Sequence, residues 1–135
     1  MSPRPPLPPD EWADPRHRLG FSGEEDAIGY LTALGWTIEA HRFRVGRNDI
    51  DLVARRDSLV AFVEVKTRRG DEFGPGRLAV GWQKRRAIER VAEIWRLRHG
   101  RPGDLYRFDV LEVIPRICEP SGIEHLEDAW RGGDR

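Results

Sequence analysis

The most restrictive feature of this sequence is a pair of apolar, strand-forming runs that lie almost next to each other. Residues 49–56 (DIDLVARR) and 59–67 (LVAFVEVKT) are rich in Val, Leu, Ile and Phe, and only Asp57 and Ser58 separate them. Runs of this composition with so short a connection predict two β-strands joined as an antiparallel hairpin. A four-residue turn over 56–59 would leave the same residues opposed, whereas a turn of odd length would not.

The register of this hairpin sorts its side chains into two faces, because side chains two apart on a strand point the same way. One face holds Asp51 opposite Glu64, Asp49 opposite Lys66 and Val53 opposite Phe62. The other face holds Ile50 opposite Val65 and Leu52 opposite Val63. We therefore predict one face of continuous core and one face on which two carboxylates lie side by side.

Two opposed carboxylates repel each other, since directly opposed residues have Cβ atoms only about 4.5–5.5 Å apart. Asp51 and Glu64 need a cation between them or a proton on one of them. Mg²⁺ meets that need, because it takes one or two carboxylates and also binds phosphate oxygens. Lys66 would then orient or deprotonate a water, or stabilise negative charge at a phosphate. The alternative is that Glu64 and Lys66 form an exposed pair on an amphipathic strand, since an isolated E-x-K pattern is common.

Lysine is rare in this chain. Of the 23 basic residues, 21 are Arg, and only Lys66 and Lys84 are Lys. An ammonium group is compact and its pKa shifts readily, whereas a guanidinium stays protonated. The retention of Lys at position 66 therefore indicates a need for an amine there.

The remaining segments complete an α/β pattern. Residues 21–34 predict a helix, with Ser22 as N-cap and Glu25 three positions later in a capping box. The other predicted elements are strands over 37–45 and 105–114, a helix over 79–99, a Gly-rich connection over 70–76, and a short strand or helical turn over 123–130. Glu24 falls within the apolar stripe of the first helix, where a carboxylate needs a partner or a metal. The alternative is that Glu24 only complements the helix dipole.

The formal net charge is zero, but only as a sum over the whole chain. Residues 1–40 and 102–135 each carry −4, and residues 41–101 carry +8. A histone-like polycation is excluded, yet a basic middle segment attracts a polyanion locally. The alternative is that these arginines only cover the solvent-exposed surface of a helix. No apolar run approaches the roughly 20 residues of a membrane span, so we expect no membrane-spanning segment.

The 135 residues suit one domain. Six prolines among the first 20 residues predict a disordered arm over 1–20, followed by a compact domain over 21–130 and a flexible tail over 131–135. Cys118 is the only cysteine, which excludes an internal disulfide and a cysteine-clustered zinc site. The first residues lack the apolar run of a secretory signal, so we expect a cytoplasmic protein.

Several short motifs, taken in order, resemble one family. They are G-E-x-x-A-x-x-Y-L at 23–31, I-D-L-V-A at 50–54, F-V-E-V-K-T-R at 62–68, F-G at 73–74, Lys84, and R-F-D-V at 107–110. The set resembles the YraN family of small bacterial proteins, which is similar to the PD-(D/E)-x-K nucleases and close to Holliday-junction resolvases. The resemblance covers about residues 19–130. It implies a restriction-endonuclease-like core, a central mixed sheet in αβββαβ order flanked by helices, and phosphodiester cleavage that depends on Mg²⁺ or Mn²⁺.

The resemblance also implies roles for particular residues. The catalytic set is Asp51, Glu64 and Lys66, and the metal ligands are Asp51, Glu64 and Glu24. Asn48 and Asp49 stand where the family usually has Gly-Glu, so Asp49 is an auxiliary acid, and the superfamily's Pro is replaced by Ile50. Lys84 matches a phosphate contact, with a solvated helix residue as the alternative. The nucleic-acid contacts expected on the basic segment are Arg68, Arg69, Arg77, Lys84, Arg85 and Arg86.

Other positions have structural interpretations. Asp109, within an apolar strand, predicts a buried pair with an Arg such as Arg107. His41 is interpreted as a surface residue, with a phosphate contact as the alternative. Phe73 and Trp82 are interpreted as core, with base stacking as the alternative.

Three hypotheses follow. The first is a metal-dependent nuclease acting on DNA, with branched or structured DNA as one substrate. The second is a non-catalytic nucleic-acid-binding module on the same fold. The third is an interaction protein that forms a homodimer through a sheet edge or a helix.

Overall fold

The computed structural model describes residues 15–69 and 80–132. Their elements, in order, are α2 (Pro15–Ala33), β1 (Thr37–Val45), β2 (Asn48–Arg56), β3 (Leu59–Thr67), α3 (Trp82–His99), β4 (Leu105–Ile114) and β5 (Gly122–Trp130). The α/β class and the order of one helix, three strands, one helix and one strand are confirmed. The segment 122–130, for which a strand or a helical turn was open, is a strand. The predicted connection over 70–76, Phe73, Arg77, residues 1–14 and residues 133–135 lie outside the described residues.

Helix α2 begins earlier than the sequence predicted. It starts at Pro15, a position where the ring already has a helical φ and the missing N–H costs no hydrogen bond. Ser22 therefore lies inside the helix, so the prediction that it is the N-cap is wrong, and residues 15–20 of the predicted arm are helical. The helix ends as predicted before Gly35, whose φ of +93° suits a residue without a Cβ. Helix α3 starts at Trp82 instead of residue 79.

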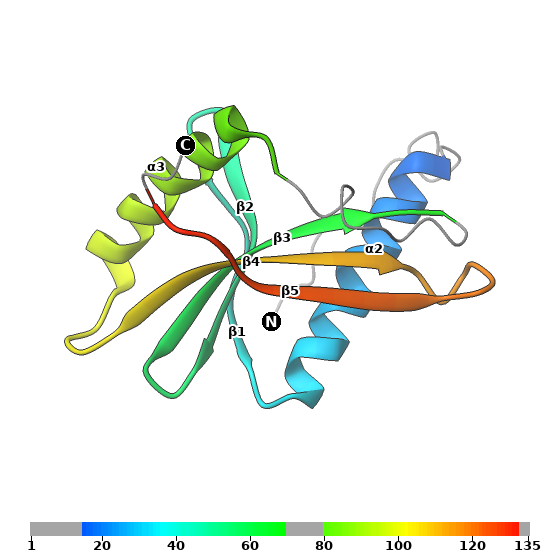
Figure 1. Cartoon of the computed structure of the whole chain (residues 1–135), viewed down its shortest axis with the longest axis horizontal. Helices are drawn as coiled ribbons and strands as arrows, with labels where there is room; N and C mark the ends of the chain where they lie inside the picture. The colour runs from blue at the N-terminus through cyan, green and yellow to red at the C-terminus, as the bar shows by residue number, and fades with distance from the viewer. Residues whose placement is uncertain (1–14, 70–79, 133–135) are drawn as a thin grey trace, which may run out of the picture.

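The five strands form one mixed sheet in the order β1-β2-β3-β4-β5. Strands β3 and β4 are parallel, and the other neighbouring pairs are antiparallel. Helix α3 lies on the crossover between β3 and β4, which parallel neighbours require. As Figure 1 shows, α3 and α2 lie on opposite sides of the sheet, so both faces are covered.

Each face of the sheet has its own core. On the α3 side, Phe62 packs against Trp95 with ring centroids 5.8 Å apart, beside Val53. On the α2 side, Leu31 packs with Leu52 among other buried residues. The prediction that only one face of the hairpin is core is therefore wrong: Val53 and Phe62, on the face expected to carry the acids, are also buried. The second helix is the reason, because it covers the face that a lone hairpin would expose.

The hairpin register is confirmed in the half nearest the turn. The pairing runs from Arg56 opposite Leu59 to Leu52 opposite Val63. Beyond that point β2 and β3 separate, as Figure 1 shows. Asp51 is therefore not paired with Glu64 through the backbone, contrary to the predicted register.

The alternation of β2 also breaks at Asp51. The pairing of β1 with β2 skips Arg42 and Asp51, and Arg42 has a φ of +57°, in the left-handed region. Ile50 packs in the α3-side core with Val53, although alternation placed it on the face of Leu52. The prediction for Ile50 is wrong because side chains do not alternate regularly between Ile50 and Leu52, which lie in different cores, whereas the register shift of the β1–β2 pair lies between Ile38 and Ala40. A strained backbone such as that of Arg42 is one mark of a functional site.

Candidate functional site

Asp51 lies at the fork where β2 leaves β3. Its Oδ2 accepts a hydrogen bond of 2.8 Å from the backbone N–H of Val65, which the separated strand no longer satisfies. The pKa of Asp51 is raised to about 8, first by burial and then by the negative charge of Glu64 and a hydrogen bond with that side chain. Glu24 adds a smaller repulsion, and the Val65 N–H acts in the opposite direction. The fork therefore brings Asp51 and Glu64 together without a backbone pair between them.

Glu64 points toward α3, where it meets a lysine. Its Oε2 lies 3.3 Å from Nζ of Lys84, and the Glu64 side chain is only 12% exposed. Burial lowers the pKa of Lys84, but the charges of Glu64, Asp51 and Asp49 outweigh it and the pKa stands above its ordinary value. Asp49, which was expected opposite Lys66, is paired with Arg44 on β1. The Lys84 ammonium group therefore contacts one carboxylate and lies within the electrostatic reach of two further acids.

Glu24 is bound by residues of β1. Its Oε1 lies 2.6 Å from Nε2 of His41 and accepts a hydrogen bond of 3.1 Å from Nε of Arg42. The Glu24 side chain is 15% exposed. The inward-facing carboxylate thus has partners from its own chain, and His41 contacts an acid, a partner that neither of its interpretations included.

Lys66 lies two residues beyond Glu64 on β3 and is half-buried. In the parallel pairing of β3 with β4 it stands opposite Glu112. Glu112 is fully buried, and its Oε1 accepts a hydrogen bond of 3.1 Å from Nε of Arg68. A buried acid beside Lys66 of β3 and Arg68, which follows β3, is a feature that sequence reasoning missed. The signal available was an acid at position 112 within an apolar strand, the same signal that singled out Asp109.

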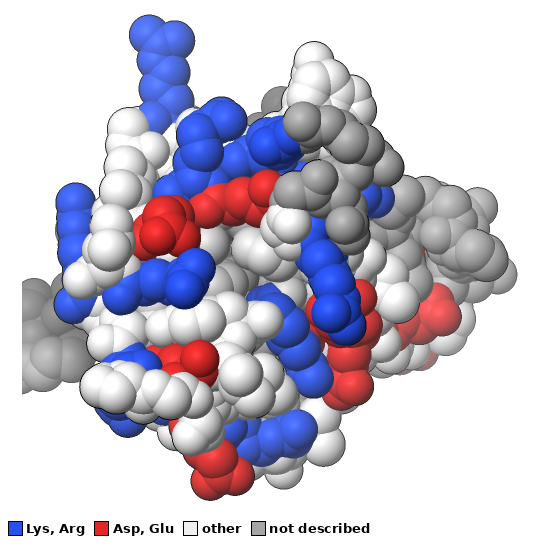
Figure 2. All heavy atoms as spheres, turned by 60° about the vertical axis from the view of Figure 1, so that its left-hand side comes forward, with Lys and Arg blue, Asp and Glu red and all other residues white. Residues whose placement is uncertain are grey.

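The predicted nucleic-acid contacts divide into two groups. Arg68 binds Glu112, and Arg85 donates to the carbonyl oxygen of Val80 at 2.7 Å, so both have structural roles. Arg69 is exposed, Arg86 is half-buried, and Lys84 is 52% exposed. Figure 2 looks onto the α3 side of the molecule and shows Lys and Arg spread over it, with Asp and Glu among them. Trp82, expected in the core, is 58% exposed, so the prediction of core packing is wrong.

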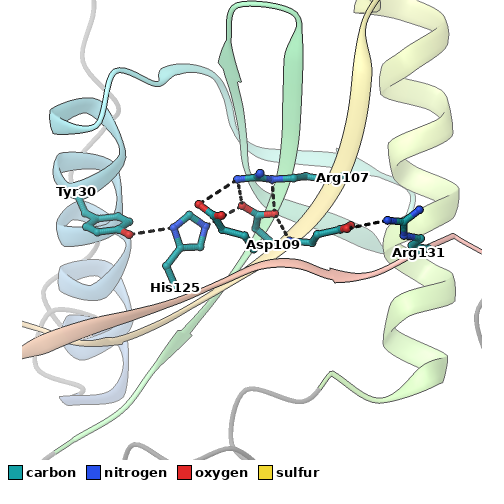
Figure 3. A network of polar contacts seen from close by, with 7 residues as sticks. Tyr30, Arg107, Asp109, His125 and Arg131 are labelled. Carbon is teal, nitrogen blue, oxygen red and sulfur yellow. Dashed lines mark hydrogen bonds and ion pairs between the residues drawn. The ribbon is translucent and has the colours of Figure 1, made fainter.

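Asp109 forms the buried pair that the sequence predicted. It is fully buried and accepts a hydrogen bond of 3.0 Å from a terminal nitrogen of Arg107. His125 of β5 lies between this carboxylate, at 2.8 Å, and the hydroxyl of Tyr30 on α2, at 3.0 Å (Figure 3). Burial raises the pKa of Tyr30, with help from Glu127 and Asp109, so its hydroxyl keeps its proton. This network ties α2 to β4 and β5 and explains Asp109 without catalysis.

The structure thus unites part of the predicted site. Asp51 and Glu64 lie together with Lys84 and Asp49 beside them, whereas Glu24 is bound to β1. Within residues 15–69 and 80–132, no group of three or more His, Cys, Asp or Glu side chains is placed to hold a metal ion. Asp51 and Glu64 are the two predicted ligands that lie side by side, and Glu24, the third, is close enough for its charge to act on Asp51.

Comparison with known proteins identifies the family. The model described as "Uncharacterised protein family UPF0102" matches residues 23–113. The chain belongs to UPF0102. The resemblance to the YraN family is thereby confirmed. A UPF0102 protein of Caldicellulosiruptor saccharolyticus is 40% identical over 102 residues, which are 76% of this chain and 86% of that relative. Another, from Myxococcus xanthus, is 33% identical over 118 residues, 87% of this chain and 93% of the relative.

The UPF0102 match includes the fork between β2 and β3 with its acids, and it ends within β4. Asp51, Glu64, Lys66 and Lys84 all lie inside it, whereas His125 lies beyond it. None of the helices in the described part of this UPF0102 protein is long and apolar enough to cross a membrane.

Proposed function

We propose that this UPF0102 protein is a divalent-metal-dependent nuclease that hydrolyses phosphodiester bonds in DNA. The observation that carries the proposal is the pair of Asp51 and Glu64 in the fork between β2 and β3. Burial and the charge of Glu64 raise the pKa of Asp51 to about 8, so the charged pair is unfavourable without a cation. A divalent cation stabilises the charged form that burial disfavours.

The chemistry of the two acids fits Mg²⁺ or Mn²⁺, which bind carboxylate oxygens and leave positions for water and phosphate. When bound, the cation would supply Lewis-acid stabilisation of charge on the phosphate. Lys66, on the same strand as Glu64, would orient the attacking water or stabilise that charge. Hydrolysis adds water to phosphorus and breaks the bond to the leaving oxygen, which takes up a proton. Arg69 and Arg86 would contact neighbouring phosphates.

A cleavage assay tests this proposal. Labelled linear, flapped and four-way-junction DNA are incubated with the protein and Mg²⁺ or Mn²⁺, with EDTA as a blank. We expect cleavage of at least one substrate with metal, and a loss of at least 100-fold in Asp51→Asn, Glu64→Gln and Lys66→Ala. The matched control is Glu93→Gln, which removes an exposed acid of α3 and should cleave like the wild type. Equal activity in all variants would reveal a contaminant and overturn the proposal.

One observation favours the non-catalytic nucleic-acid-binding module as a second candidate. Basic side chains of the protein already contact two of the acids, Lys84 at Glu64 and Arg42 at Glu24. Such a module predicts DNA binding that falls with salt and is unchanged by Asp51→Asn, with no cleavage of any substrate.

A further inference from the structure

Lys84 is placed where a cation bound by the acidic pair would compete with it. Its Nζ lies 3.3 Å from Oε2 of Glu64, a carboxylate that is 12% exposed. The charges of Asp51 and Asp49 also act on this ammonium group. Lys84 therefore supplies the positive charge that the acids require when no metal is present.

The contact can break without disturbing the fold. Helix α3 is fixed by buried residues further along it, Ile88, Val91 and Trp95. The Lys84 side chain is 52% exposed and lies near the start of the helix, before these anchors. A lysine has a flexible four-carbon stem and a compact charge, so its head group can move several ångströms while its backbone stays in place.

We propose that Lys84 is the internal counter-ion of the acidic pair: it neutralises Glu64 in the metal-free protein, is displaced when a divalent cation binds, and then contacts a phosphate of the nucleic acid. This inference rests on the proposed nuclease function. It makes metal binding and nucleic-acid binding cooperative, because the cation releases the ammonium group that the phosphate attracts. By linkage, the nucleic acid must increase the affinity for the cation by the same factor.

Calorimetric titration of Mn²⁺ into the protein without DNA tests the competition directly. Wild type, Lys84→Met and Arg90→Met are compared; Arg90→Met removes an exposed charge from the same helix. We expect Lys84→Met to bind Mn²⁺ about tenfold more tightly than the wild type, and Arg90→Met to differ less than twofold. Thermal unfolding of all three proteins checks that the fold is intact.

The outcomes separate this inference from the proposed function. If the wild type binds Mn²⁺ and Lys84→Met binds it no more tightly, the counter-ion role is wrong while the metal site stands. If neither protein binds Mn²⁺, both proposals fail. A second measurement uses a short DNA duplex, whose affinity should rise more with Mn²⁺ for the wild type than for Lys84→Met, because only the wild type also gains the contact of the released ammonium group. An equal rise in both proteins would overturn the coupling.

Discussion

Asp51 is the residue at which the backbone irregularity, the separated strands and the acidic pair meet. Its side chain replaces a backbone acceptor for the Val65 N–H, so it has a structural as well as a chemical role. Burial and Glu64 together keep a proton on this carboxyl up to about pH 8, whereas its ordinary pKa is 3.8. The unfolded chain releases that proton several pH units earlier than the folded chain.

This difference predicts how the metal-free protein responds to pH. Between about pH 4 and pH 8 the folded state holds a proton that the unfolded state has lost, so stability from this group is present at low pH and is lost as pH rises through 8. The free energy of unfolding should decrease across this window by up to about 1.4 kcal/mol per pH unit from this one group. Urea denaturation in EDTA at several pH values measures it. Asp51→Asn should remove this decrease, whereas the control Asp57→Asn, in the exposed hairpin turn, should retain it. If the free energy of unfolding of Asp51→Asn changed with pH in parallel with that of the wild type, Asp51 would not be the group responsible.

The distance between α2 and the sheet is set by a glycine. A Cβ added at Gly23 would lie 2.3 Å from Oγ1 of Thr67 and 2.9 Å from its Cγ2, so rotation of that β-branched side chain gives no relief. The next residue is Glu24, which binds β1 and acts on Asp51. The close packing of α2 on β3 therefore also positions an acid near the fork.

Substitution of this glycine should be costly, although alanine normally favours a helix. We expect Gly23→Ala to destabilise the protein by about 1–3 kcal/mol through overpacking. Gly29→Ala is the matched control: it lies in the same helix with nothing within 4 Å of the added Cβ, and should be neutral or stabilise by up to about 1 kcal/mol. Chemical denaturation of both variants measures the difference. Equal stabilities would show that α2 can move away from β3 at no cost.

Across the whole molecule, folding redistributes the charge of the basic middle segment. Arg55 is buried and bound to Asp104, with 2.6 Å between Nη1 and Oδ1, and Arg68 is bound to Glu112. In both pairs an Arg of the basic segment is neutralised by an acid of the last segment. The surface available to a polyanion is therefore less basic than the +8 of residues 41–101. Among the predicted phosphate contacts in the described residues, Lys84 and Arg69 are exposed and Arg86 is half-buried.

The salt dependence of DNA binding counts those contacts. In the metal-free protein Lys84 neutralises Glu64, so Arg69 and Arg86 remain to neutralise one phosphate each; the slope of log K against log salt should then be about −1.8, and Arg69→Gln should reduce its magnitude by about 0.9. Fluorescence anisotropy with a labelled duplex between 50 and 300 mM NaCl measures this slope. Arg116→Gln, which removes an 85% exposed side chain bound to Asp26, should leave the slope unchanged. A slope near zero would exclude phosphate contacts from the interaction.

Local pattern was sufficient for most of the fold. The strands 37–45, 59–67 and 105–114 were predicted with the bounds that the structure has, and the hairpin register held near its turn, because alternation and turn length act between neighbours in the chain. The pairing of Asp109 with Arg107 was also predictable, since two residues on one strand face share a side.

The contacts between distant segments required the tertiary structure. The sequence pattern does not predict the left-handed φ of Arg42, the break in alternation at Asp51 or the separation of β2 from β3. These features arise from the packing of strands and helices that are distant in the chain. For the same reason the sequence did not predict that Glu24 contacts His41 and Arg42. The sequence alone determined that two acids and a lysine lie on one hairpin. Only the fold decided that Lys84, from a helix 20 residues later, is the cation that Glu64 contacts.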